Sequence, residues 1–286
     1  MRTTLLADIG GSKSRFALAN PAGAPARMSV IENDTVADLD AAVARYLEET
    51  GARPRAATLA VAGPVDGEEI ALTNRTSWRF RRREFAKRFG FSQLRVLNDF
   101  EAIAWALPRL DAAQTRPLGK PVAGHAGVKV VLGPGTGLGV AALLPADGRW
   151  HVVASEGGHA SFGPQAPDEI EVFARLRQEC GAVSAETVLS GSGLARLARQ
   201  RACSNGLGRF AGGLALTFKA LGGVYIAGGV ASGLGPLLDE PQFRAAFEAH
   251  PPYQRLLETI PTLLITCEEP GLIGCAAVAS EHAVTA

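Results

Sequence analysis

The sequence predicts an α/β fold built from two halves that begin in the same way. Its 286 residues are enough for about two domains, and its hydrophobic fraction of 47% is enough for a substantial core. Each half opens with a buried strand, a glycine-rich turn and a returning strand, the two turns being residues 10–14 and 133–139. This similarity indicates a weak internal duplication of the architecture.

The first half alternates expected strands with expected helices. Short apolar runs bounded by glycine, proline or polar residues are typical of strands, whereas an apolar residue at every third or fourth position is typical of a helix. We expect strands at residues 5–9, 15–19, 28–32, 56–62, 70–72 and 94–97, and helices at 36–49, 81–89 and from Asn98 or Asp99 onward.

The second half follows a segment that carries several prolines and glycines, residues 108–127. The same criteria predict three strands at its start and a mixture of helices and strands after them. We expect strands at residues 128–132, 140–144, 150–154, 224–227 and 263–266, and helices at 168–179, 186–200, 209–221 and 271–282.

The composition argues against several classes of protein. Formal net charge is +1, with 29 basic and 28 acidic residues, so nothing indicates binding to nucleic acid or to an anionic membrane. No apolar run is long enough to span a membrane, and the opening residues do not resemble a signal peptide. The four cysteines are too widely spaced for a zinc site or a disulfide framework, so we expect reduced thiols and a cytoplasmic protein.

Asn98 and Asp99 stand where an expected strand ends and a helix begins. Asn and Asp are favoured helix caps, and residues 95–102 by themselves favour capping as the role of Asp99. A carboxylate at the carboxyl end of a strand also lies where open α/β sheets bind their ligands. Catalysis by Asp99 is therefore the alternative.

Two glycine turns suggest sites for phosphate groups. Asp8 stands beside Gly10, Gly11 and Ser12, so backbone N–H groups can approach an anion and Asp8 can hold Mg²⁺, although an ordinary hairpin turn explains these residues equally well. The second turn, residues 135–139, is neither a Walker A loop nor a dinucleotide fingerprint. Two such turns facing each other across a cleft favour a nucleotide.

Glu156 and His159 surround two glycines in a short loop. A metal site would need a further His or Cys nearby, whereas a sugar suits a carboxylate acceptor and an imidazole. Glu186 stands at an expected helix start, where interaction with the helix dipole explains it without any ligand.

Taken together, these motifs make nearly the whole chain similar to one known family of proteins. In their order and spacing the chain resembles the bacterial glucokinases of the hexokinase–actin–Hsp70 superfamily, in the branch without the zinc-binding cysteine motif of repressor-type sugar kinases. The motifs are residues 8–12, 97–100, 135–139, 156–159, 184–193 and 222–229.

The resemblance implies an α/β fold of two RNase H-like (actin-like ATPase) domains, with mixed sheets flanked by helices and a cleft between the domains. We expect a small domain of residues 1–109 with 271–286, and a large domain of residues 110–270. A homodimer is expected by analogy with the family.

The implied activity is ATP-dependent phosphorylation of glucose at its 6-hydroxyl, with Asp99 as the general base. Sugar binding would fall to Asn98, Asp99, Glu156, His159 and Glu186. ATP would be held by Asp8, Gly10, Gly11, Ser12, Gly135, Thr136, Gly137, Gly228 and Gly229, with Asp8 also holding Mg²⁺, directly or through water.

The chain departs from the family at two places. Ser12 and Lys13 replace the usual Thr-Asn, which adds a cation near the expected phosphates. Only residues 201–207 bridge two helices that a long helical segment separates in the family, and this shortening should expose apolar surface on the helix at 209–221. Two alternatives therefore stand beside a glucokinase: a sugar-binding or regulatory protein with weak or lost kinase activity, and a kinase for another sugar or sugar acid.

Overall fold

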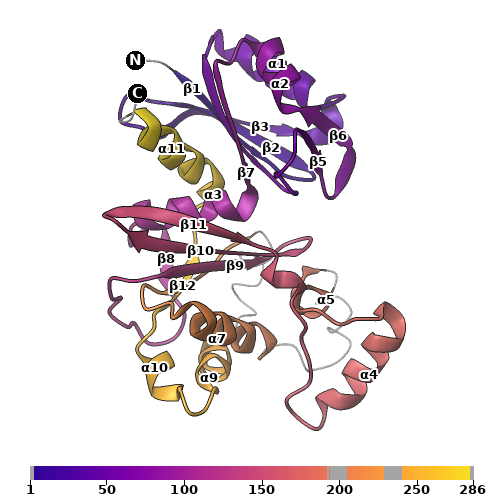
Figure 1. Cartoon of the computed structure of the whole chain (residues 1–286), viewed down its shortest axis with the longest axis vertical. Helices are drawn as coiled ribbons and strands as arrows, with labels where there is room; N and C mark the ends of the chain where they lie inside the picture. Colours follow the sequence, from indigo (N-terminus) through magenta and orange to yellow (C-terminus); the bar gives the residue numbers. More distant parts are fainter. Residues whose placement is uncertain (1–2, 192, 194–204, 229–239, 284–286) are drawn as a thin grey trace. The chain divides into compact units, whose positions relative to one another are not determined.

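The computed structural model describes residues 3–191, 193, 205–228 and 240–283. The chain divides into two compact units. Unit 1 comprises Met1–Leu110 with Glu268–Ala286, and unit 2 comprises Asp111–Cys267. Unit 1 therefore receives its last helix from the end of the chain, drawn in yellow in Figure 1.

Unit 1 contains a five-stranded mixed sheet in the order β3-β2-β1-β4-β7. The first three strands form an antiparallel meander, and β4 and β7 run parallel to β1. The strands are β1 (Thr4–Ile9), β2 (Lys13–Ala19), β3 (Pro25–Glu32), β4 (Ala56–Val61) and β7 (Gln93–Asn98).

Both faces of this sheet are covered, because side chains alternate along each strand. Leu5, Ala7 and Ile9 of β1 belong to a core that includes α1 (Leu39–Thr50), α2 (Arg82–Phe89) and the hairpin of β5 (Glu69–Leu72) and β6 (Arg75–Arg81). Leu6 belongs to a second core with α3 (Asp99–Ala106) and α11 (Pro270–Ala283). Figure 1 shows α1 and α2 on one face and α11 on the other.

Helices α3 and α11 approach each other backbone to backbone. A Cβ atom added at Gly274 of α11 would lie 1.7 Å from the carbonyl oxygen of Ala102 in α3. Only glycine permits this approach, so the position of α3 depends on that residue.

Unit 2 contains a six-stranded sheet in the order β11-β10-β9-β12-β13-β8. Its first five strands repeat the order and the directions of unit 1, which confirms the duplicated architecture that the sequence predicts. The strands are β8 (Thr115–Pro117), β9 (Lys129–Pro134), β10 (Leu138–Ala146), β11 (Arg149–Ser155), β12 (Val224–Ile226) and β13 (Thr262–Ile265).

The helices of unit 2 include α4 (Glu169–Cys180), α5 (Ala185–Leu189), α7 (Gly206–Phe218), α9 (Glu240–Glu248) and α10 (Gln254–Glu258). Gly208 and Gly212 of α7 lie against carbonyl oxygens of α9, because added Cβ atoms would stand 2.3 and 2.4 Å from those oxygens. Every apolar side chain of α7 is consequently buried or half-buried. The expected exposure of apolar surface on α7 is therefore wrong, since α9, which the sequence did not reveal, covers it.

Two further predictions need correction. The helix expected at residues 186–200 is interrupted, because α5 ends at Leu189 and Ser190 is extended with φ −71° and ψ 168°. Residues 191 and 193 are again helical, and residues 192 and 194–200 lie outside the described part of the chain. The sequence reading also missed β6, β8, α9 and α10. In contrast, the predicted end of α1 is confirmed, since Gly51 takes the left-handed conformation with φ 64°.

The described cysteines, Cys180, Cys267 and Cys275, are free thiols, and Cys203 lies outside the described residues. Among the described helices, none combines the length and the apolar character that crossing a membrane requires.

Candidate functional site

The predicted residues of unit 1 follow the carboxyl ends of neighbouring parallel strands. Ile9 of β1, Val61 of β4 and Asn98 of β7 occupy the same register. The Asn98 side-chain Nδ2 donates a hydrogen bond to the carbonyl oxygen of Gly63, 3.3 Å away, which ties β7 to the loop after β4. One edge of the sheet thus carries both the first glycine turn and Asp99, where open α/β sheets bind ligands.

Asn98 is the residue that caps α3. Its Oδ1 accepts hydrogen bonds from the N–H groups of Phe100 (2.9 Å) and Glu101 (3.4 Å), and Glu101 Oε2 accepts one from the Asn98 N–H (3.3 Å). This reciprocal pair is a capping box. Asp99 is the first helical residue and half-buried, and its Oδ1 accepts a bond from the Phe100 N–H at 3.0 Å. The helix therefore has its cap without Asp99.

The carboxyl group of Glu101, which completes the capping box, is partly buried. Burial raises the pKa of its carboxyl, and the hydrogen bond from the Asn98 N–H acts in the opposite direction. The start of α3 is thus held partly by a carboxyl group whose pKa burial raises.

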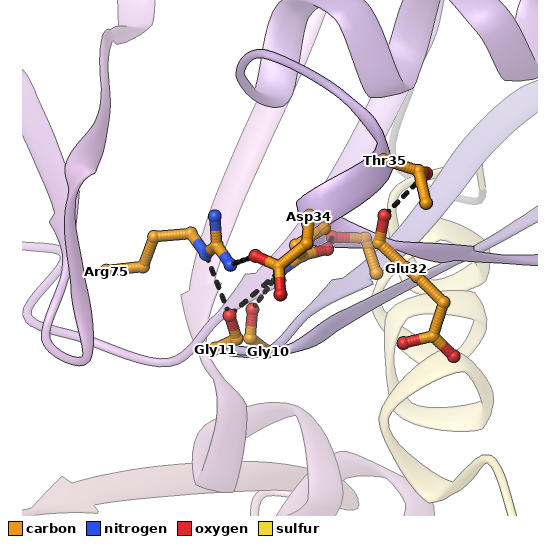
Figure 2. Close-up of polar contacts among 8 residues, drawn as sticks. Gly10, Gly11, Glu32, Asp34, Thr35 and Arg75 are labelled. Atoms are coloured by element: carbon orange, nitrogen blue, oxygen red, sulfur yellow. Dashed lines mark hydrogen bonds and ion pairs between the residues drawn. The ribbon is translucent and has the colours of Figure 1, made fainter.

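The first glycine turn has its carbonyl groups fastened to the rest of unit 1 (Figure 2). The buried Asn33 donates through Nδ2 to the carbonyl oxygens of Gly10 (2.8 Å) and Gly11 (3.1 Å). Arg75 Nε donates to the same Gly11 oxygen at 3.0 Å. Among the described residues we find no acceptor for the N–H groups of Gly11 and Ser12, so these two donors are available to an anion.

The sequence reading missed Asn33 and Arg75 altogether. They belong to no motif and stand 22 and 64 residues from Gly11 along the chain. Lys13, whose charge was expected near the phosphates, pairs instead with Glu32 of β3 at 2.8 Å. The exchange of Thr-Asn for Ser-Lys therefore adds a cation that is paired with Glu32.

Asp8 lies against the first turn of α11. A Cβ atom added at Gly271 would stand 2.9 Å from Asp8 Oδ2, so glycine makes room for the carboxylate at the positive end of the helix. Arg15, opposite Asp8 in the hairpin, pairs with Glu269 at 2.9 Å. Burial raises the pKa of Asp8 above its ordinary value, and the charge of Arg15 opposes this shift.

Asp8 fits a magnesium ion that arrives with a nucleotide. The described residues contain no cluster of three or more His, Cys, Asp or Glu side chains that would hold a metal ion by themselves. Mg²⁺ in nucleotide sites commonly takes only one or two protein carboxylates and completes its shell with phosphates and water. A single carboxylate beside a glycine turn is consistent with that arrangement.

The predicted sugar residues of unit 2 converge at the end of β11. His159 Nε2 lies 4.0 Å from Glu156 Oε2 and 3.9 Å from Glu186 Oε2. An isolated bridge between Ser161 and Ser184 brings the loop after β11 to the start of α5 and so to Glu186. The side chains of Glu156, His159 and Glu186 are 78%, 60% and 32% exposed, which leaves their polar atoms open to a ligand.

Glu186 also connects this cluster to the second glycine turn. Its Oε2 accepts a hydrogen bond from the Leu138 N–H at 2.9 Å, and a Cβ atom at Gly137 would stand 2.5 Å from the same oxygen. Ser184 caps α5 and forms a capping box with Thr187. Glu186 lies in the first turn of α5, as the sequence predicts, and its carboxylate also reaches β10.

The second glycine turn meets the end of β12. The Gly135 N–H donates to the Gly137 carbonyl oxygen at 2.8 Å, and Thr136 is exposed at the tip. Gly228 has φ +102°, and an added Cβ atom would lie 2.8 Å from the carbonyl oxygen of Pro134. Gly228 and the turn are thus brought together, whereas Gly229 lies outside the described residues.

Comparison with known proteins gives a consistent result over the whole chain. The family model named Glucokinase matches residues 5–207 and 202–282. A glucokinase of Mesorhizobium japonicum is 38% identical over 314 residues, which cover 96% of this chain and 91% of that protein. The bifunctional protein glk of Burkholderia lata is 40% identical over 312 residues, covering 97% of this chain and 48% of that protein. The chain thus spans about half the length of the Burkholderia lata protein.

Among solved structures, a glucokinase from an Antarctic psychrotroph superimposes with a TM-score of 0.84 at 32% sequence identity. The alignment covers 98% of this chain and 99% of that one. This likeness confirms the predicted fold class, an α/β protein with RNase H-like mixed sheets flanked by helices.

Proposed function

The chain belongs to the glucokinase family, and we propose that it transfers the γ-phosphoryl group of ATP to the 6-hydroxyl of glucose. The products are glucose 6-phosphate and ADP. The new bond joins the sugar oxygen to the γ-phosphorus, and the bond that breaks joins this phosphorus to the bridging oxygen that leaves with ADP.

The observation that carries the proposal is that Asn98, and not Asp99, caps the start of α3. Asn98 caps the helix through its own side chain, so the neighbouring Asp99 is not required for that task. Asp99 lies at the same sheet edge as a glycine turn that has two available N–H groups. As general base, Asp99 takes the proton from the 6-hydroxyl while the sugar oxygen attacks the phosphorus.

The remaining roles follow from donor and acceptor chemistry. Asn98, Glu156, His159 and Glu186 bind the sugar hydroxyls, which both donate and accept hydrogen bonds. The turns at residues 10–12 and 135–137 hold the phosphates, the first through the N–H groups of Gly11 and Ser12, and residues 228–229 border the adenosine. Asp8 holds Mg²⁺, which neutralises phosphate charge when it is bound.

Sugar-dependent ADP release tests the proposal directly. Wild-type protein with ATP and Mg²⁺ is expected to turn over glucose, and Asp99→Asn is expected to lower kcat by about 10²–10⁴-fold. The melting temperature should change little, because Asn98 still caps α3. The affinity for the sugar should also change little. Asp147→Asn is a matched control, since Asp147 lies at a hairpin tip with φ 51°, a conformation that Asn tolerates.

Three outcomes distinguish the alternatives. Full activity of Asp99→Asn would contradict the role of Asp99 as base. Glucose binding in calorimetry without ADP release from the wild type would identify a sugar-binding or regulatory protein. Faster turnover of another hexose or sugar acid in a substrate panel would identify a kinase of different specificity.

A further inference from the structure

Arg75 makes contacts that single it out from the other cations of the β5–β6 hairpin. Its Nε donates to the carbonyl oxygen of Gly11 at 3.0 Å, and its Nη2 pairs with the carboxylate of Asp34 (Figure 2). Its guanidinium also lies 5.3 Å from the ring centroid of the buried Trp78. A planar guanidinium fixes the directions of its donors, so these contacts hold Arg75 in one orientation.

We propose, building on the function proposed above, that Arg75 is a positioning residue for the nucleotide phosphates. It acts through the turn at residues 10–12 and touches neither substrate. Its task is to orient one peptide group of that turn, together with Asn33, so that the N–H groups of Gly11 and Ser12 point toward a phosphate.

The geometry of the peptide group explains how this works. In a trans peptide the C=O and the following N–H point in opposite directions. The carbonyl of Gly11 and the N–H of Ser12 belong to one such group, and the carbonyl of Gly10 and the N–H of Gly11 belong to the preceding one. Donation to both carbonyls from Arg75 and Asn33 therefore directs both N–H groups away from the body of unit 1.

Charge adds to this orientation. A cation on the carbonyl oxygen polarises the peptide group and strengthens the opposite N–H as a donor, so Ser12 gains most from Arg75. The same contacts keep two carbonyl oxygens from facing a phosphate, which they would repel. Asn33 provides the neutral half of the support, because its Oδ1 accepts from Ser14 Oγ at 2.7 Å and its N–H donates to the Ser12 carbonyl at 2.8 Å.

Kinetics with separate titration of the two substrates tests the role. Arg75→Gln is expected to raise the KM for ATP about tenfold, the effect of one lost charge-assisted hydrogen bond, and to change the Kd for glucose less than about twofold. Arg75→Lys should recover part of the loss, because it restores the charge without the planar fork. Arg79→Gln is the matched control, since Arg79 lies on the same strand, is 61% exposed and pairs only loosely with Glu69 at 3.7 Å.

A second measurement does not depend on turnover. In Arg75→Gln the rise in melting temperature caused by ATP with Mg²⁺ should be smaller than in the wild type. An unchanged KM for ATP in an active Arg75→Gln protein would overturn the inference. So would equal losses toward both substrates with a lowered melting temperature, which would indicate a purely structural role.

Failure of the proposed function is distinguishable. If the wild type releases no ADP but ATP still raises its melting temperature, the kinase proposal fails and the thermal shift of Arg75→Gln still decides the inference. If ATP does not stabilise the wild type at all, the turn holds no nucleotide phosphate and the inference fails as well.

Discussion

Glu186 links His159 to the glycine turn at residues 135–139, and replacing it with Gln removes the charge while keeping the size of the side chain. Glu186→Gln keeps an oxygen that can accept the Leu138 N–H, now 2.9 Å from Glu186 Oε2. The fold should therefore survive, while a sugar hydroxyl loses a charged acceptor. We expect glucose affinity in calorimetry to fall by about tenfold or more. The control is Glu179→Gln at the exposed end of α4, which should bind glucose like the wild type.

At the residue level, candidate site residues within short motifs could be predicted from the sequence, whereas contacts between residues far apart in the chain could not. Asn98, Glu156, His159 and Glu186 could be predicted as site residues because each stands in a short motif, and their roles stay predictions. Arg75 could not be predicted in this way. Its partner Gly11 lies 64 residues away along the chain, and no sequence pattern indicates a contact over that separation. Long-range contacts of this kind depend on sheet register, which single motifs do not encode.

The contact between α3 and α11 makes Gly274 a sensitive position. Gly274→Ala would place a Cβ atom 1.7 Å from the Ala102 carbonyl oxygen, so the two helices must move apart. We expect a loss of stability of about 1–3 kcal/mol in denaturant unfolding, and a lower kcat because α3 begins at Asp99. Gly213→Ala on α7, where no atom lies within 4 Å of the added Cβ, should be neutral or stabilising by up to about 1 kcal/mol. Equal stability of the two variants would contradict this account of the contact.

The capping box of α3 predicts a pH dependence of stability. Burial raises the pKa of Glu101 above its ordinary value of 4.5 in the folded protein, so the folded state binds its proton more tightly than the unfolded state does. Its stabilising contribution is fully present below the ordinary pKa and is lost as pH rises through the raised folded pKa. Urea unfolding measured across this window should show that decline, and Glu101→Gln should flatten it while keeping the cap. A slope that is the same in the variant would assign the dependence to other groups.

At the level of elements, boundaries marked by glycine or a cap were predictable. Gly51 ends α1, and an Asn or Asp starts α3, as the sequence indicates. The expected helix at 186–200 is wrong at Ser190, where α5 ends, because Gly191 directly after it was not interpreted as a helix end. Strand β6 was missed since its two buried aromatic residues, Trp78 and Phe80, alternate with charged and polar neighbours that resemble a helix start.

For the whole molecule, the similar openings of the two halves were sufficient to predict a repeated architecture, and the shared strand order bears this out. The route of the chain was not predictable from those openings. Unit 1 is completed by α11, whose Leu272, Cys275, Ala276 and Val278 bury apolar surface against β1 and β4. A homodimer stays a prediction, which sedimentation velocity would test.

Removal of residues 268–286 tests the dependence of unit 1 on its closing helix. The truncated chain loses the covering of one sheet face, so unit 1 should become sensitive to proteases and expose its amides to hydrogen exchange. Unit 2 has its own core and should keep its protection. Equal protection of unit 1 in the truncated and full-length proteins would show that α11 contributes little.

Because α11 is translated after all of unit 2, its position in the sequence also has a consequence for biosynthesis. The strands of unit 1 leave the ribosome before residues 111–267 are translated, and only then does their last helix appear. At about 5–20 residues per second, this delay lasts roughly 8–30 seconds. For that interval the apolar face formed by Leu6, Ala17 and Ala60 lacks its covering helix. Unit 1 is therefore synthesised first, but it can complete its core only after unit 2 has been translated.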